Sequence, residues 1–157
     1  MVLILKQINQ YLLFVADRYG YPQVETDETN NTKAVAISLT APDLQVTAAT
    51  APTTAVLGET VELTWTVTNK GTGTANRDWY DRVYLSSDQT YNYGDVQVAF
   101  ETISTQTPLA KDGSYTISKS IVLPSFATGD QYLLFIADRD NYQGETDETN
   151  TVSYTHL

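Results

Sequence analysis

A long internal repeat is the feature that most constrains how this chain can fold. Residues 11–18 read YLLFVADR and residues 132–139 read YLLFIADR, an offset of 121 residues (132 minus 11). The hexapeptide ETDETN occurs at 25–30 and again at 145–150, an offset of 120, so the second copy has one residue fewer between the two blocks. A period of about 120 residues exceeds the unit of a solenoid and matches a whole β-sandwich domain.

The repeat indicates that the chain holds the end of one unit followed by one complete unit. We expect residues 1–42 to contain the C-terminal hairpin of a preceding repeat and a linker, and residues 43–157 to form a complete domain. An isolated hairpin is marginally stable in water, and Leu12 to Val15 form an apolar run. Residues 11–39 are therefore expected to self-associate by pairing with a free sheet edge, in the same chain or a second molecule, or else to be disordered.

Alternation of apolar and polar residues predicts strands throughout the complete unit. The clearest case is residues 60–68, where every second residue is apolar and the others are Glu or Thr. No helical period is present, so the prediction is an all-β, antiparallel two-sheet sandwich of about seven strands, preceded by an orphan β-hairpin. The expected strands are 43–47, 79–86, 96–103, 115–123, 132–137 and one beginning near 151.

Composition excludes several classes of function. The net charge of −10 repels phosphate backbones and anionic lipid, so no nucleic-acid partner is expected. No stretch approaches 18 apolar residues, so no membrane insertion is expected, and an export signal would lie outside this sequence. There are no cysteines, and the sole histidine, His156, is the penultimate residue. We therefore expect no catalytic residues, no cofactor-binding residues and no enzymatic activity.

Several phrases of the sequence resemble a known family. They are LTWTVTNKGTGTA at 63–75, DRVYLSSD at 81–88, YTISKSIVLP at 115–124 and YLLFIADRDN at 132–141, which leads into ETDETN. Together they resemble the CARDB domain, the cell-adhesion-related domain found in bacteria, in full over about residues 42–155 and as a terminal piece over 11–40. One departure is Thr151, where the family ending continues with a second Asn, as Asn31 does in the first copy.

The resemblance implies an immunoglobulin-like sandwich, usually present in tandem in large prokaryotic surface or secreted proteins. It implies no catalytic residues. The expected function is a non-catalytic adhesion or spacer module located outside the cell or on its surface. Its partners would be the adjacent repeats and a protein or glycan ligand.

The acidic loop before the last strand is the candidate metal site. Calcium takes six to eight oxygen ligands, and clustered carboxylates gain from neutralisation. The first copy repeats the pattern at residues 17–30, although Asp140 and Asn141 of the second copy correspond to Tyr19 and Gly20. Two alternatives remain open: one solvated face of a hairpin whose Asn and Asp residues close turns, or a protein-binding surface. The candidate metal ligands are Asp138, Glu145, Asp147, Glu148 and Asn150.

Aromatic residues cluster around the strand at 79–86 and the loop after it. Exposed aromatic rings can stack on sugars, so the alternative function is a carbohydrate-binding module with Trp79, Tyr80, Tyr91 and Tyr93 as candidate ligand residues. Packing is the competing interpretation, and it applies to Trp65 and also to Trp79. The loop at 88–95 has oxygen side chains spaced like the start of an EF-hand, but Gly94 falls at position 7 and no Glu stands at position 12, which favours a plain turn.

Overall fold

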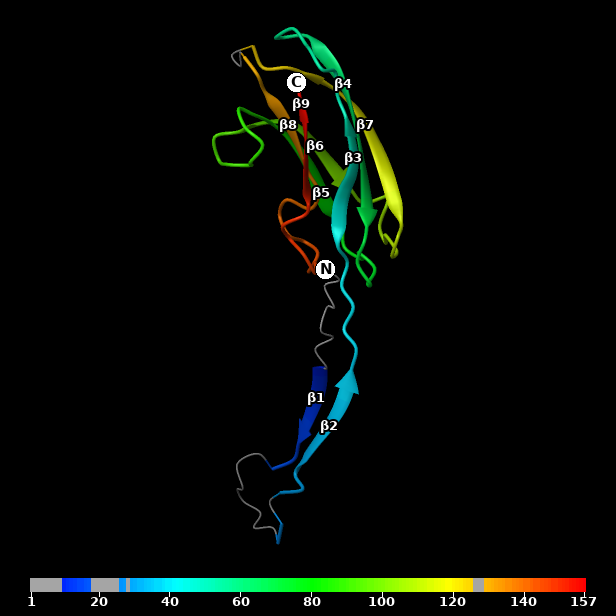
Figure 1. Cartoon of the computed structure of the whole chain (residues 1–157). Coiled ribbons are helices and arrows are strands. Elements are labelled where there is room, and N and C mark those ends of the chain that lie inside the picture. The colour runs from blue at the N-terminus through cyan, green and yellow to red at the C-terminus, as the bar shows by residue number, and fades with distance from the viewer. Residues whose placement is uncertain (1–9, 18–25, 28, 126–128) are drawn as a thin grey trace, which may run out of the picture. The chain divides into compact units, whose positions relative to one another are not determined.

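The computed structural model describes residues 10–17, 26–27, 29–125 and 129–157 (Figure 1). These residues contain nine strands and no helix. The chain forms two compact units, Met1–Leu39 and Thr40–Leu157, and each is described here by itself.

The first unit contains a two-stranded antiparallel hairpin. Strand β1 (Gln10–Val15) pairs with β2 (Thr32–Ile37), so that Tyr11 lies opposite Ala36. The predicted hairpin is therefore present. Its apolar side chains are exposed, since Leu12, Leu13 and Phe14 keep 50%, 64% and 60% of their surface accessible. Pairing of residues 11–39 with a free sheet edge, in the same chain or a second molecule, stays a prediction.

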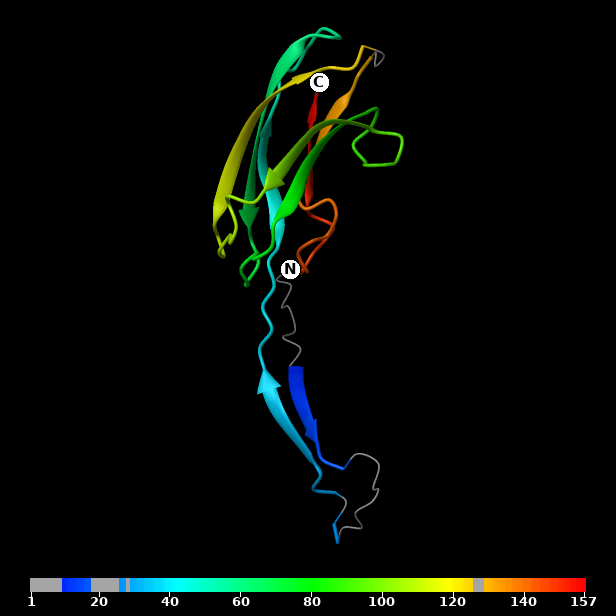
Figure 2. The same cartoon turned by 180° about the vertical axis from the view of Figure 1, so that it is seen from behind.

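The second unit is a sandwich of two antiparallel sheets (Figures 1 and 2). One sheet has the strand order β3-β4-β7 and the other has the order β6-β5-β8-β9. The prediction of an all-β immunoglobulin-like sandwich of about seven strands is confirmed. The strands are β3 (Leu44–Thr50), β4 (Thr60–Asn69), β5 (Trp79–Ser86), β6 (Val96–Ile103), β7 (Ser114–Val122), β8 (Tyr132–Ile136) and β9 (Val152–His156).

The core lies between the two sheets and follows the period-two pattern. Trp65 of β4 reaches across to Phe135 of β8, with ring centroids 5.9 Å apart. Strand β8 lies between β5 and β9 and is buried on both faces, because Leu134 and Ile136 on its outer side pack under Tyr84. Residues 132–137 are apolar at nearly every position, as a central strand covered on both sides requires.

A carboxylate is buried at the centre of this core. Asp81 of β5 is 1% exposed and accepts hydrogen bonds from Trp65 Nε1 (2.9 Å), Trp79 Nε1 (3.2 Å) and the Tyr115 hydroxyl (2.7 Å). Burial raises the pKa of Asp81 to about 6, although these donors act in the opposite direction. The aromatic donors of both sheets thus converge on one side chain, which fixes how the sheets pack.

Candidate functional site

The acidic loop between β8 and β9 is folded around Asp138. This residue is 1% exposed and has a positive φ of 41°. Its carboxylate accepts hydrogen bonds from the backbone N–H groups of Tyr142 (2.9 Å) and Gln143 (2.7 Å). Burial raises the pKa of Asp138, and these donors oppose the rise. The buried carboxylate of Asp138 therefore holds the loop in its folded conformation through these two backbone hydrogen bonds.

Glu145 connects the same loop to the beginning of the sandwich. Its Oε2 accepts a 2.6 Å hydrogen bond from the backbone N–H of Leu44, the first residue of β3. Burial raises the pKa of Glu145 to about 8, and the nearby carboxylates of Glu148 and Asp138 add to the rise. Its second oxygen, Oε1, is buried without a hydrogen-bond partner.

Two further bonds attach the loop to residues 41–44, which we call the lead-in segment. Asn150 Nδ2 donates to Asp43 Oδ1 at 3.0 Å, and the backbone N–H of Thr146 donates to the Pro42 carbonyl at 3.0 Å. The loop therefore holds three consecutive residues of the lead-in segment, 42 to 44. The side-chain oxygen of Asn150 is, like Glu145 Oε1, buried without a partner.

The turn after β4 holds the lead-in segment from the other side. Asn69 Oδ1 accepts a hydrogen bond from Asp43 N–H (3.1 Å), and the Ala41 carbonyl accepts hydrogen bonds from Thr72 N–H (3.0 Å) and Gly73 N–H (2.8 Å). A Cβ at Gly71 would overlap the backbone of residues 41–43, so this close approach requires glycine. We call the turn 69–73, the loop 145–150 and the segment between them the lead-in site.

The other carboxylates of the predicted metal set also accept hydrogen bonds within the loop. Asp147 Oδ1 accepts from the backbone N–H (2.9 Å) and hydroxyl (2.6 Å) of Thr149, and Glu148 Oε1 accepts from the N–H of Glu145 (3.3 Å). These threonine bonds lower the pKa of Asp147, which is exposed. Within the part of the chain that the structure describes, no group of three or more His, Cys, Asp or Glu side chains converges as a metal site would. Calcium binding stays a prediction.

The first copy of the loop repeats the same local geometry where it is described. Asp27 Oδ1 accepts hydrogen bonds from the N–H and the hydroxyl of Thr29, at the distances found for the Asp147 turn, 2.9 and 2.6 Å. Asp17, the counterpart of Asp138, also has a positive φ, 38°. Glu25 and Glu28, which match Glu145 and Glu148, lie outside the described residues.

The structure corrects one of the four candidate glycan-binding residues. Trp79 is 0% exposed, and its indole N–H donates to Asp81 Oδ1 and to the Tyr115 hydroxyl, each at 3.2 Å. Its ring lies between the two sheets, so it cannot stack on a ligand at the surface. The structure therefore supports the packing interpretation of Trp79, as it does for Trp65, which is 2% exposed.

The remaining aromatic candidates lie on or near the outer face of the β6-β5-β8-β9 sheet. Tyr80 stacks on Phe100 (centroids 4.9 Å apart) and meets the edge of Tyr142 (5.5 Å). Tyr91 packs on the outer face near Arg139, whose Cζ lies 4.4 Å from the ring centroid, while Tyr93 is 97% exposed. The sequence interpretation missed Phe100 and Tyr142, because they come from β6 and from the acidic loop.

An ion pair lies beside these rings. Arg82 and Asp140 form a 2.5 Å contact, and the Arg82 guanidinium lies 5.5 Å from the Phe100 ring centroid. The loop at 88–95 forms turns of its own, in which Asp88 Oδ1 accepts from Thr90 N–H and Asp95 Oδ2 accepts from Asn92 N–H. These bonds agree with the turn interpretation of that loop.

Comparison with protein families identifies the complete unit. Residues 41–155 match the CARDB family model. The chain belongs to the CARDB family. CARDB domains are non-enzymatic, adhesion-related modules associated with bacterial surface or extracellular proteins. A comparison with curated protein sequences found no match.

Solved CARDB structures share this fold. The crystal structure of the CARDB domain of the PF1109 protein from Pyrococcus furiosus, in complex with di-metal ions, has a TM-score of 0.57 at 18% identity, covering 77% of this chain and 96% of that one. The solution NMR structure of the same domain gives 0.57 at 20% identity, with coverages of 76% and 95%. β-Glucosidase 3B from Thermotoga neapolitana matches at a TM-score of only 0.46 and 11% identity over 79% of this chain and 16% of that one, which carries no argument about activity.

Among the described residues, no helical segment has the length and hydropathy of a membrane span.

Proposed function

We propose that this CARDB domain is a non-catalytic spacer or adhesion module in a tandem array, exported to the cell surface or beyond it. The observation that carries the proposal is the lead-in site. Two phrases of the sequence, NKGTG at 69–73 and ETDETN at 145–150, both form hydrogen bonds to residues 41–44, where the chain enters the sandwich. The polar residues of both phrases thus hold the segment through which the chain enters the domain.

The path of the chain through the sandwich supports a spacer. The lead-in segment enters at one end and β9 finishes at the opposite end (Figures 1 and 2). Repeats of this kind would therefore follow one another head to tail, and tension would pass along each sandwich. A lead-in segment bonded on both sides resists being peeled away, because its hydrogen bonds must break together.

Single-molecule pulling on the chain, tethered through its two ends, tests the spacer proposal. We expect Glu145→Ala to lower the unfolding force of the sandwich, because it leaves the N–H of Leu44 without its acceptor. Asp147→Ala is the matched control, since it removes a carboxylate of the same loop that bonds only to Thr149. Equal unfolding forces for the two variants would count against the proposal that the lead-in site resists tension.

We further propose that calcium stabilises the lead-in site. Two oxygens support this: Glu145 Oε1 and Asn150 Oδ1 are both buried without a partner in the same loop. The Pyrococcus furiosus relative was crystallised with di-metal ions. The fit is incomplete, because calcium takes six to eight oxygens and the carboxylates of Asp138, Asp147 and Glu148 accept hydrogen bonds within the loop. Ligation by these three would require the loop to rearrange.

Thermal unfolding in about 5 mM calcium, which exceeds the roughly 0.1–1 mM dissociation constants of extracellular calcium modules, tests that proposal against unfolding in EDTA. A site in the native state raises the midpoint by several degrees through linkage. Asn150→Ala should abolish the rise if the orphan amide oxygen is a ligand. An unchanged midpoint in the parent chain would contradict calcium binding at this loop.

The second candidate function is glycan binding at the outer face of the β6-β5-β8-β9 sheet. Phe100 and Tyr142 are 39% and 45% exposed beside the Arg82–Asp140 pair, so apolar rings lie next to groups that can bond to hydroxyls. A glycan array at high protein density tests this, with Phe100→Ala and Tyr142→Ala as loss-of-binding variants. Binding that survives both changes would exclude this face.

We also propose that residues 11–39 self-associate through the free edge of β1. The exposed Leu12, Leu13 and Phe14 support this, because monomeric proteins seldom expose adjoining apolar side chains of this size. Light scattering on the chain with and without residues 1–40 measures the association. If both forms contain the same number of chains per particle, intermolecular pairing through these residues is ruled out.

A further inference from the structure

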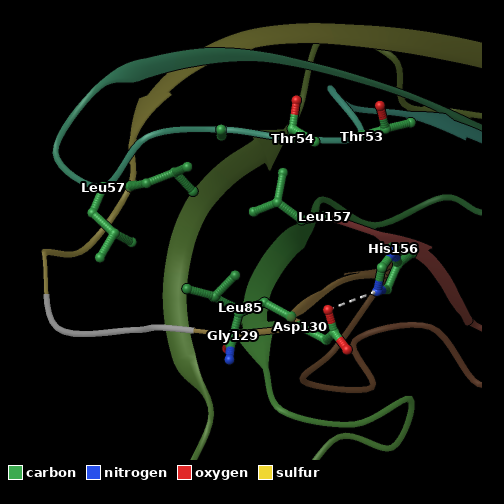
Figure 3. Close-up of a pocket in the computed structure, with 11 residues that line it drawn as sticks. Thr53, Thr54, Leu57, Leu85, Gly129, Asp130, His156 and Leu157 are labelled. Atoms are coloured by element: carbon green, nitrogen blue, oxygen red, sulfur yellow. Dashed lines mark ion pairs between the residues drawn. The ribbon is translucent and has the colours of Figure 1, made fainter.

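An open pocket of about 440 Å³ lies at the end of the sandwich where β9 finishes (Figure 3). Its apolar lining comes from four separate segments that each contribute a leucine. Leu85 and Leu123 are buried, whereas Leu57 is 39% exposed. Leu157, directly after β9, completes the lining. The volume is sufficient for a bulky apolar side chain.

The rim of the pocket is polar. His156 and Asp130 form a 3.9 Å contact there, and their side chains are 56% and 92% exposed (Figure 3). A pair this exposed contributes little binding energy, because water screens it. The apolar lining therefore decides what the pocket favours.

Alternation along β9 determines which following residue faces the pocket. Tyr154 and His156 point to the outer side of the sheet, where both rings contact Tyr132. Leu157 packs against the main core on the inner side, and its N–H continues the pairing to the Gln131 carbonyl. If the chain continues as a strand, the residue two positions after Leu157 lies on the inner side as well.

The first copy of the repeat shows which residue type occupies the equivalent position after the strand. At the offset of 120 residues given by the two ETDETN motifs, Leu157 corresponds to Ile37 (157 minus 120). The residue two positions after Ile37 is Leu39, which is 69% exposed at the end of the first unit. In the first copy, therefore, an apolar residue stands where alternation places an inward-facing side chain.

We propose that the pocket binds the side chain of the leucine equivalent to Leu39, in the segment that leaves each repeat. This inference rests on the proposed tandem arrangement. The outgoing segment would cover Leu57 and Leu85 with its own leucine, two residues beyond Leu157. Each repeat would then hold its incoming segment by hydrogen bonds at the lead-in site and its outgoing segment by apolar burial at the opposite end.

The test extends the full chain after Leu157 by Ser-Leu-Thr-Ala-Pro, the sequence of residues 38–42. The matched control extension carries serine in place of the leucine. We expect the leucine extension to raise the thermal midpoint of the sandwich by about 5 °C over the serine extension, since it buries one leucine side chain. Equal midpoints for the two extensions would overturn the proposal.

A pocket variant localises the effect. In Leu57→Ser, a change at a side chain that is already 39% exposed, the advantage of the leucine extension should fall by at least half. An advantage that stays the same size in Leu57→Ser would place the leucine elsewhere and also overturn the proposal. Failure here leaves the pulling comparison of Glu145→Ala and Asp147→Ala unaffected, because those residues lie at the other end of the sandwich.

Discussion

Glu145→Gln separates the hydrogen bond at the lead-in site from the charge that this site carries. The glutamine keeps a carbonyl oxygen that can accept from the N–H of Leu44, but it cannot ionise. In the parent chain, burial raises the pKa of Glu145 to about 8. The folded state therefore binds the proton more tightly than the unfolded chain does. The contribution of this residue to stability is complete at low pH and decreases as the pH rises from about 4.5 to about 8.

The size of the effect follows from the pKa. A rise from the ordinary value of 4.5 to about 8 corresponds to an upper limit of about 5 kcal/mol, at about 1.4 kcal/mol for each pH unit. The side chain is only partly buried, so water screens part of this energy and we expect about 1–2 kcal/mol. The parent chain should lose stability between pH 5 and pH 8, in part through Asp81, whose pKa burial raises to about 6. Asp81 is present in both chains, so Glu145→Gln should lose about 1–2 kcal/mol less than the parent chain over this range.

Urea unfolding at several pH values, in EDTA so that no metal contributes, measures the two slopes. Asp147→Asn is the matched control, because it removes one charge from the same loop at an exposed carboxylate whose pKa is lowered by its bonds to Thr149. That control should keep the slope of the parent chain. If Glu145→Gln and the parent chain lose the same stability from pH 5 to pH 8, the buried carboxyl is not the source of the pH dependence and the reasoning is refuted.

Three other substitutions probe the sandwich, each measured by urea unfolding. Gly71→Ala should destabilise the sandwich by about 2–4 kcal/mol, because the added Cβ overlaps the backbone of residues 41–43. Gly144→Ala is the control and should cost under about 1 kcal/mol, because open space surrounds that position. Equal costs for the two variants would contradict the close approach at Gly71. Asp81→Asn should cost about 1–3 kcal/mol, since an amide nitrogen would face indole or hydroxyl donors, and a neutral result would mean that those donors find other acceptors. Trp79→Phe should cost about 1–3 kcal/mol through lost packing and two lost hydrogen bonds, and no loss of stability would contradict its place in the core.

The strands could be predicted because their pattern is local. Strands β5 and β6 occupy the predicted residues 79–86 and 96–103, and β4 extends the predicted 60–68 by one residue. The same alternation along β5 favours the packing interpretation of Trp79. Trp79, Val83 and Leu85 have the same parity along the strand, so Trp79 belongs on the face that the two apolar residues share, in the core.

The function of the acidic loop could not be predicted, because its contacts are distant in sequence. Glu145 and Leu44 are 101 residues apart, and Asn150 and Asp43 are 107 apart. Composition alone shows a group of carboxylates, for which calcium ligands and turn-closing residues have the same signature. Only the strand order of the folded sandwich reveals that residues 42–44 lie against this loop.

The two copies of ETDETN separate the contacts that form locally within the motif from the contacts that require the rest of the domain. The Asp–Thr turn has the same bonds at 27–29 and at 147–149, although the described part of the first unit contains only two strands. The turn is therefore a local product of a few residues. The bond from Leu44 to Glu145 is different, because it joins the start of β3, which pairs with β4, to a loop that closes around Asp138. On the proposed arrangement, each connection in an array becomes fixed only when the repeat that it leads into has folded.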